Sequence, residues 1–250
     1  MRCWRASSVQ SVQDTYDERV CDIEAHFELV KNISEAIGNG GAKFPVSNGH
    51  YIITIQQQKI LFSSTYLQLY NLVESTVNQL LAAVGRHSQN GINGDLTKLS
   101  DMIRNLYLKH MLPAEASLTP ETRLEHAIKL LHQAVGTEQV KIIIPRGGGG
   151  NWDSKAISNL NTRIGVELAL PATMREKLHR PFHNDQGPLQ YIKDVRNRLG
   201  HGSVSFTDCG TGHSYSEFRT LIDIVKEYLE LLMGAYNQYI NNQQYLASIA

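Results

Sequence analysis

The strongest constraint on the fold of this chain is a long helical pattern from about residue 56 to residue 84. Apolar residues lie on more than one face of this segment, which is typical of a helix surrounded by other helices. Apolar periodicity predicts further helices over about 10–37, 96–110, 119–135, 188–200 and 215–239. A chain of 250 residues can bury a substantial core beneath them. The sequence therefore predicts an all-α protein, an antiparallel bundle around the central helix.

The end of the first predicted helix suggests how the chain is divided. This helix, over about 10–37, is followed by a glycine-rich stop at Gly38–Gly41. We expect it to pack outside the main core, as an N-terminal helical extension formed by residues 1–50. Residues 51–250 then form the principal helical domain, and no second globular domain is indicated.

A short apolar run at Gln139–Ile144 predicts a minor β-like segment, ended by Pro145. The glycines Gly147–Gly150 follow it. Ahead of a helix, such a loop could present backbone N–H groups to a phosphate, or it could be a flexible connection into a helix capped near Asn151 or Asp153. No Gly-Lys-Ser/Thr follows, so an NTP-binding P-loop is not indicated.

Polar and cationic side chains are concentrated at the end of the helix predicted over 188–200. Its apolar positions recur at helical spacing and form a core-facing stripe: Leu189, Ile192, Val195 and Leu199. On a different face, Asp194, Asn197 and His201 fall within about 60° of each other. Arg196 lies about 140° from His201 on an ideal helix. It meets that imidazole only by side-chain reach, by opening of the helix at Gly200, or across a two-fold axis from a second chain.

An acid interrupts the apolar stripe of the central helix. Glu74 falls near Leu67, Tyr70 and Val77 on the helical wheel. A buried carboxylate needs a partner or it becomes protonated. Arg196 is the expected partner, through a charge-assisted contact that orients the guanidinium. The alternative is that Glu74 lies at the margin of the stripe, in water.

Two segments carry a resemblance to a known family. The stretch Arg-Asn-Arg-Leu-Gly-His at 196–201, followed by Gly-Ser-Val-Ser-Phe, resembles the active-site motif of HEPN-superfamily ribonucleases. Tyr70–Val77 resembles the first core helix of a prokaryotic stand-alone branch of that superfamily. The resemblance covers about residue 55 to the C terminus. It implies an all-helical, metal-independent endoribonuclease whose homodimer brings two motifs into one cleft, with roles in phage defence, toxin–antitoxin pairs or RNA processing.

The resemblance assigns catalytic roles to three residues. His201 could exchange a proton with a ribose 2′-OH or with the 5′ leaving oxygen. Arg196 could stabilise charge on the phosphate, and Asn197 could hydrogen-bond the phosphate or the imidazole. Glu74, Asp194 and Arg198 are supporting residues, although Arg198 is not part of the motif. No metal or other cofactor is expected, because the nucleophile is a hydroxyl of the substrate.

Two less specific interpretations remain for the same residues. Arg196 could simply pair with a carboxylate while His201 caps carbonyls at a helix end. The chain could also be a non-catalytic HEPN-like module that binds RNA or a partner protein. Two further patterns are weaker: Arg104–His110 has too long a gap and no following glycine, and Pro181 disrupts the register that His179 and His183 would need to share a metal.

Charge and cysteine content indicate the partners and the compartment. The chain has 24 basic and 24 acidic residues, but residues 141–200 carry ten basic and five acidic ones, a net charge of +5. This basic half is compatible with RNA as a partner. Three scattered cysteines favour reduced thiols, and no signal core or membrane-spanning stretch is expected, which predicts a cytoplasmic location. An antitoxin or sensor protein is a further possible partner.

Overall fold

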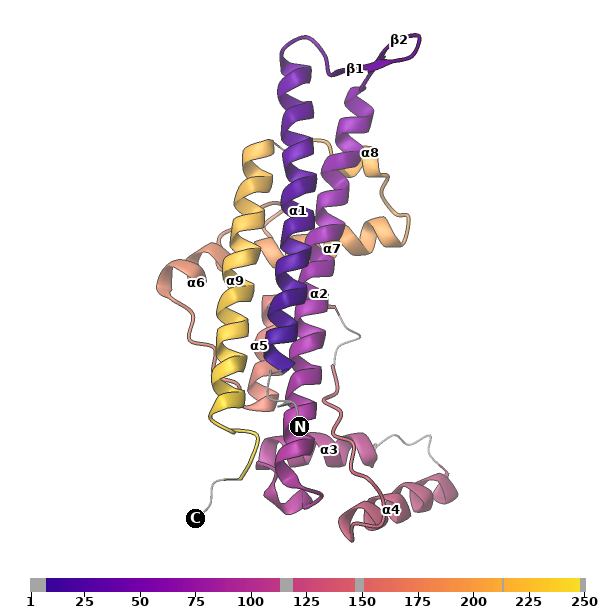
Figure 1. Ribbon diagram of the computed structural model, residues 1–250, viewed down its shortest axis with the longest axis vertical. Coiled ribbons are helices and arrows are strands. Elements are labelled where there is room, and N and C mark those ends of the chain that lie inside the picture. The colour runs from indigo at the N-terminus through magenta and orange to yellow at the C-terminus, as the bar shows by residue number, and fades with distance from the viewer. Residues whose placement is uncertain (1–7, 113–118, 147–150, 213, 248–250) are drawn as a thin grey trace, which may run out of the picture.

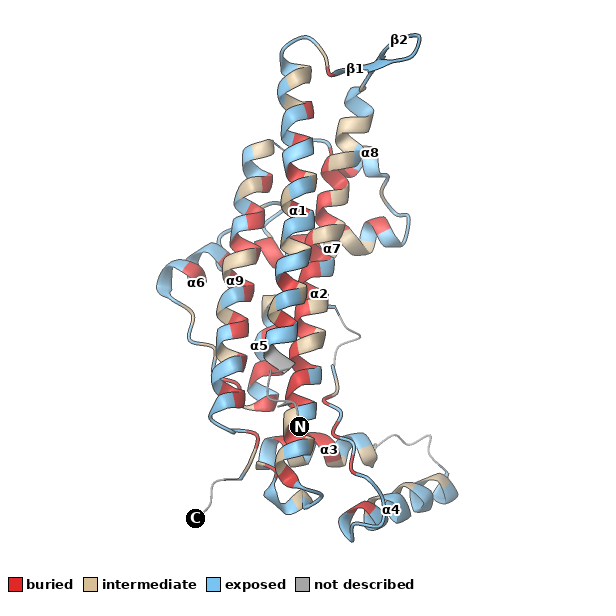
Figure 2. Cartoon of the chain, in the orientation of Figure 1, coloured by how far each residue is buried: buried red, intermediate tan, exposed pale blue. Residues whose placement is uncertain are grey.

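The structure is a computed structural model that describes residues 8–112, 119–146, 151–212 and 214–247. Three long helices run along its longest axis: α1 (Ser8–Gly38), α2 (Ile55–Ile92) and α9 (Tyr215–Asn241) (Figure 1). α2 is central, because it packs against α1, α7, α8 and α9. Buried residues line the surfaces where these helices meet (Figure 2). The predicted all-α class is confirmed.

α2 has well-defined ends but is longer than predicted. Thr54 caps its N terminus in a capping box with Gln57, and Asn93 ends it in a left-handed conformation with φ 50°. The sequence pattern predicts an end near residue 84, and that prediction is wrong because the helix continues to Ile92. Gly85 lies so close to the segment at 139–144 that an added Cβ would be 2.6 Å from the Ile142 carbonyl oxygen. The glycine therefore allows close packing rather than ending the helix.

α1 packs into the shared core instead of outside it. Its buried residues belong to the same cluster as those of α2 and α9: Val12, Tyr16, Ile23, Phe27 and Val30. Phe27 stacks on Tyr215 of α9 with 4.4 Å between ring centroids. The expectation that α1 lies outside the core is thus incorrect, because its apolar stripe packs against both α2 and α9. A division of the chain at residue 50 stays a prediction.

An ion-pair network also holds α1 to α9. The Glu24 carboxylate accepts hydrogen bonds from Arg219 at 2.6 Å and Lys226 at 2.7 Å. The hydrogen bond from Arg219 contributes most to lowering the pKa of Glu24 to about 2. Because folding lowers this pKa, the ion pairs of Glu24 stabilise the folded protein at neutral pH. This stabilisation is lost as pH falls from the ordinary carboxyl range toward 2.

The strands lie elsewhere than predicted. β1 (Lys43–Val46) and β2 (Gly49–Ile52) form an exposed antiparallel hairpin in which Phe44 faces Tyr51. The run at 139–144 forms no strand, although Val140, Ile142 and Ile144 are buried and alternate with exposed residues. Its alternating pattern fits burial of one side on the helices, with no strand of the described chain paired to it.

The remaining elements surround the three long helices. They are η1 (Leu96–Lys98), α3 (Asp101–Met111), α4 (Pro120–Ala134), α5 (Ser154–Ile164), α6 (Ala172–His179), α7 (Pro188–Gly200) and α8 (Phe206–Cys209). Asp153 caps α5, as expected, by accepting a hydrogen bond from the Ala156 amide. The short helix α8 was not predicted. The glycines at 147–150 lie outside the described residues.

The shared core makes a specific prediction about α1. Phe27→Ala should lower the free energy of unfolding of the whole protein by about 3–5 kcal/mol, because it leaves a cavity between α1 and α9. Leu29→Ala, a truncation of an exposed residue on the same helix, should change it by less than about 0.5 kcal/mol. Urea denaturation followed by circular dichroism measures both. A Phe27→Ala protein in which α1 unfolds separately from an unchanged core would contradict the prediction.

Candidate active site

α7 presents the motif because its opposite side is buried. Leu189, Ile192, Val195 and Leu199 are all buried, which confirms the predicted stripe. Pro188 occupies the first turn, where its missing N–H costs no hydrogen bond. α7 packs on α2 and also touches α6, α8 and α9. With its apolar side fixed in this way, α7 leaves its polar side partly exposed.

Arg196 is held in place by contacts that join α7 to α2. Its guanidinium carbon lies 4.6 Å from the centre of the Tyr70 ring, and Nη2 is 3.7 Å from Glu74 Oε2. Nη1 donates a hydrogen bond of 3.0 Å to Asn197 Oδ1. The predicted pairing of Arg196 with Glu74 is therefore present. Both side chains keep partial exposure, 37% and 28%, so Glu74 is neither fully buried nor free in water.

Tyr70 was not recognised as part of this site from the sequence. The aromatic face beneath the Arg196 guanidinium attracts the cation through its quadrupole. The Trp152 backbone N–H donates to the Tyr70 hydroxyl at 3.3 Å. Burial raises the pKa of Tyr70, so the ring stays neutral. The available signal was position: Tyr70 is one helical turn before Glu74 and shares its face of α2.

A second ion pair fixes the middle of α7. Lys193 Nζ lies 2.6 Å from Asp153 Oδ2, and both side chains are largely buried. Burial opposes the charged ammonium, but the hydrogen bond and charge of Asp153 outweigh it and raise the pKa of Lys193. Asp194 is 3.6 Å from the same ammonium and accepts a hydrogen bond from Gln186. Asp194 is thus engaged beside the motif, and within the described residues no hydrogen bond joins it to Asn197 or His201.

His201 lies at the C-terminal end of α7 and is exposed. Its backbone N–H donates to the Asn197 carbonyl at 2.9 Å. Within the described residues no hydrogen bond or ion pair joins its imidazole to Arg196. Arg198 is exposed as well, and its carbonyl accepts a hydrogen bond from the Ser203 amide. One chain therefore brings together Arg196, Asn197 and Glu74, and leaves His201 facing solvent.

The loop after His201 is anchored by α8. The Ser63 hydroxyl of α2 donates to the Phe206 carbonyl. Gly210 lies against the Lys59 carbonyl, where an added Cβ would be 2.1 Å from the oxygen. This contact draws the chain that follows the motif tightly onto α2. This contact could not be predicted from local sequence, because it depends on a tertiary approach.

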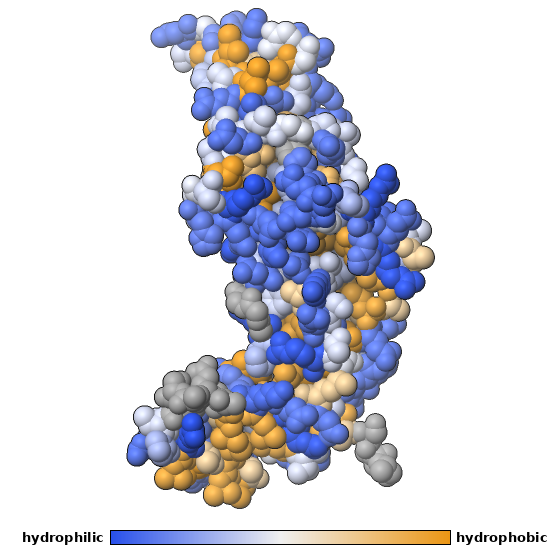
Figure 3. Space-filling view, turned by 180° about the vertical axis from the view of Figure 1, so that it is seen from behind, coloured by the Kyte–Doolittle hydropathy of each residue, from blue (hydrophilic) through white to orange (hydrophobic). Residues whose placement is uncertain are grey.

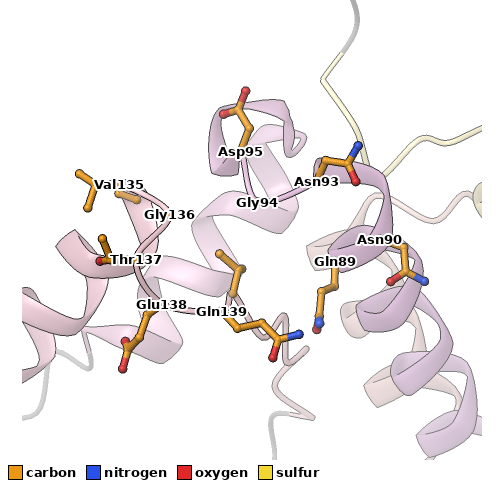
Figure 4. Close-up of a pocket in the computed structure, with 12 residues that line it drawn as sticks. Gln89, Asn90, Asn93, Gly94, Asp95, Val135, Gly136, Thr137, Glu138 and Gln139 are labelled. Atoms are coloured by element: carbon orange, nitrogen blue, oxygen red, sulfur yellow. The ribbon is translucent and has the colours of Figure 1, made fainter.

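Other features of the described residues do not provide a rival site. An open groove of about 980 Å³ lies between the end of α2 and the turn after α4, lined by amide side chains such as Gln89, Asn93 and Gln139 (Figure 4). It includes no residue of the motif. Across the described ranges, no three His, Cys, Asp or Glu residues gather as a metal site. None of the helices described there has the length and apolar character required to cross a bilayer.

Fold and site together define the class of protein. An all-α bundle with a guanidinium and an imidazole displayed at the end of one helix is what the resemblance to HEPN proteins implies. The chain belongs to the MAE_28990-like HEPN family, whose model matches residues 8–245. The match includes α1 and so extends well beyond the segment that showed the resemblance. A search of curated proteins and a search of solved structures both give no match.

The contact at Gly210 yields a prediction about the loop after the motif. Gly210→Ala should lower the melting temperature by several degrees, because the methyl group collides with backbone that cannot move aside. Gly200→Ala is the matched control: nothing lies within 4 Å of its added Cβ. Alanine in that last helical turn should be neutral or stabilising by up to about 1 kcal/mol. Differential scanning calorimetry compares them, and equal melting temperatures would contradict the proposed anchor.

Proposed function

We propose that this protein is a metal-independent endoribonuclease. The observation that carries the proposal is the Arg196 guanidinium, held half-exposed by Tyr70 and Glu74 beside Asn197, with the His201 imidazole exposed at the same helix end. Membership of the HEPN family supports it. Arg196, Asn197 and His201 are the proposed catalytic residues, with Glu74 as a positioning residue.

The proposed chemistry uses the substrate's own hydroxyl. The ribose 2′-oxygen attacks phosphorus and loses its proton, while the bond from phosphorus to the 5′ oxygen breaks and that oxygen gains a proton. The products are a 2′,3′-cyclic phosphate and a 5′-hydroxyl end. An imidazole at His201 can accept the first proton or donate the second, a role typically worth about 10²–10⁴ in rate. Arg196 stabilises charge on the non-bridging oxygens. DNA lacks the nucleophile.

The arrangement in one chain favours a composite site in a homodimer. Arg196 and His201 lie on different sides of α7 and share no bond within the described chain. A two-fold axis near the exposed end of α7 would place the imidazole of one protomer beside the guanidinium of the other. Both side chains are accessible for that purpose. Asp194 and Arg198 would lie at the edge of the same cleft as supporting residues.

The biological setting follows from the family likeness alone. We propose a toxin-type or phage-defence ribonuclease in the cytoplasm, restrained by an antitoxin or activated by a sensor protein. Cys21 and Cys209 are both free thiols, which is compatible with a reducing compartment.

The central test compares variants in RNA cleavage. His201→Ala and Arg196→Ala should each abolish cleavage of cellular RNA, with products of the wild type ending in 2′,3′-cyclic phosphate and EDTA without effect. Matched controls are Arg104→Ala and His110→Ala, the similar pattern on α3, which should keep full activity. Circular dichroism confirms that all four variants are folded. Clean preparations of either motif variant that still cut RNA would refute the assignment.

A second prediction concerns Tyr70. Tyr70→Leu should lower cleavage by about 2–5-fold, because it removes a cation–π contact of roughly 0.5–1 kcal/mol that orients Arg196. Tyr70→Phe retains the aromatic face and should stay near the wild-type rate. Single-turnover kinetics with a labelled oligonucleotide measures both. Equal losses in the two variants would indicate that the hydroxyl, and not the ring, matters.

The alternative is a non-catalytic module that binds RNA. It is supported by the net charge of +5 over residues 141–200. Tight binding of RNA with no product over long incubation would support it. Binding that depends on salt but not on His201 would do the same.

A further inference from the structure

α4 stands at one end of the molecule, attached by only one of its sides. It lies beside α3 at the lower end in Figure 1, and its C-terminal end borders the groove at the end of α2. Thr119 caps it and Pro120 begins it, so its limits are well defined. On its inner side Leu130 packs on the core, and Gln133 is buried and accepts a hydrogen bond from the Tyr107 hydroxyl.

The outer side of α4 is a continuous apolar surface. It consists of Leu124, Ile128 and Leu131 of the helix and of Val135, which follows its last residue, with exposed fractions of 61%, 45%, 61% and 63%. Ala127 and Ala134 are exposed on the same side. Figure 3 shows hydrophobic residues gathered at this end of the molecule. We call these six residues the α4 stripe. Contiguous exposed apolar surfaces of this kind usually mark an interaction site.

The spacing of the α4 stripe specifies the shape of its partner. Its four large residues follow one another at intervals of four, three and four positions. This is the repeat of a and d positions in a coiled coil, where each side chain inserts between residues of a second helix. The alanines beside this seam leave room for close approach. The α4 stripe therefore fits another helix of similar length.

We propose that α4 is a homotypic association helix, which pairs antiparallel with α4 of a second copy of this chain. In that arrangement Leu124 lies opposite Val135, and Ile128 lies opposite Leu131. Each pair occurs twice about the two-fold axis, which gives four apolar layers and uses every large residue of the stripe. Ala127 then lies beside Ala134 of the second copy.

Charge favours a second copy over other occupants. α4 carries two acidic and two basic residues, Glu121, Glu125, Arg123 and Lys129, so its net charge is zero. In the antiparallel pair, Glu125 lies opposite His132 of the second copy, which is a complementary combination. Helices that lie on membranes or RNA are instead rich in Lys and Arg on their polar side. A helix with both signs interspersed complements itself.

The size of the α4 stripe limits the strength of the pairing. A helix of 15 residues is about 22 Å long, so four layers bury less than a standard interface of roughly 800 Å² per partner. Association through α4 alone should therefore be weak and depend on concentration. It does not require the proposed cleavage activity, and it involves a different part of the chain from α7.

Mass measurement at increasing concentration tests this inference. Ile128→Glu places a charge in the middle of the α4 stripe, and sedimentation velocity should then show the loss of one association step, up to a two-fold lower average mass at high concentration. Arg123→Gln is the matched control, because it changes net charge equally but lies outside the stripe. Circular dichroism verifies that both variants are folded. Identical mass curves for the wild type and Ile128→Glu would overturn the proposal.

Cross-linking tests the antiparallel orientation separately. In a background with Cys3 and Cys21 replaced by serine, a mixture of Ala127→Cys and Ala134→Cys proteins should form a disulfide-linked pair under mild oxidation. Each variant alone should form much less. Efficient linkage of each variant with itself but not in the mixture would refute the antiparallel pairing. Because neither experiment measures RNA cleavage, failure of the α4 proposal can be distinguished from failure of the nuclease proposal.

Discussion

The docking of α7 on α2 is the constraint on which the candidate site depends. Four buried apolar residues set the rotation of α7, and the largely buried pair of Lys193 with Asp153 fixes it to the start of α5. Because the rotation of α7 is fixed, the directions of the polar side chains near its end are fixed as well. Arg196 meets Tyr70 and Glu74 on α2, and His201 faces solvent. Packing energy thus determines where the charged groups lie.

The contacts of Arg196 are better suited to orientation than to stability. An ion pair at 3.7 Å with both partners partly exposed contributes little net free energy, typically about 0–1 kcal/mol. The Tyr70 ring beneath the guanidinium and the hydrogen bond to the Asn197 amide oxygen nevertheless restrict where that group can point. Restricting a long side chain before substrate arrives reduces the entropy lost on binding. The neutral, buried Tyr70 provides this support without adding charge.

The local sequence pattern was sufficient to predict the features in which one face of a helix is either buried or polar. The stripe on α7 and the acid at Glu74 in an apolar surface could both be read from spacing, and the structure confirms the stripe and the contact with Arg196. Prediction failed where a tertiary approach decided the outcome. Gly85 lies inside α2 where a carbonyl of the segment at 139–144 approaches it, and α1 joins the core by packing on α2 and on Tyr215 of α9. Neither partner is visible in the local sequence.

The two proposed contact surfaces, the end of α7 and the α4 stripe, would then control assembly through different forces. The end of α7 is polar and half-exposed, so contact there is electrostatic and sensitive to salt. The α4 stripe is apolar, so contact there gains free energy from burial and persists at high ionic strength. When both occur in one chain, the first contact raises the effective concentration for the second wherever geometry allows both. Two individually weak interfaces could therefore make assembly depend steeply on the amount of protein, without any change in the fold.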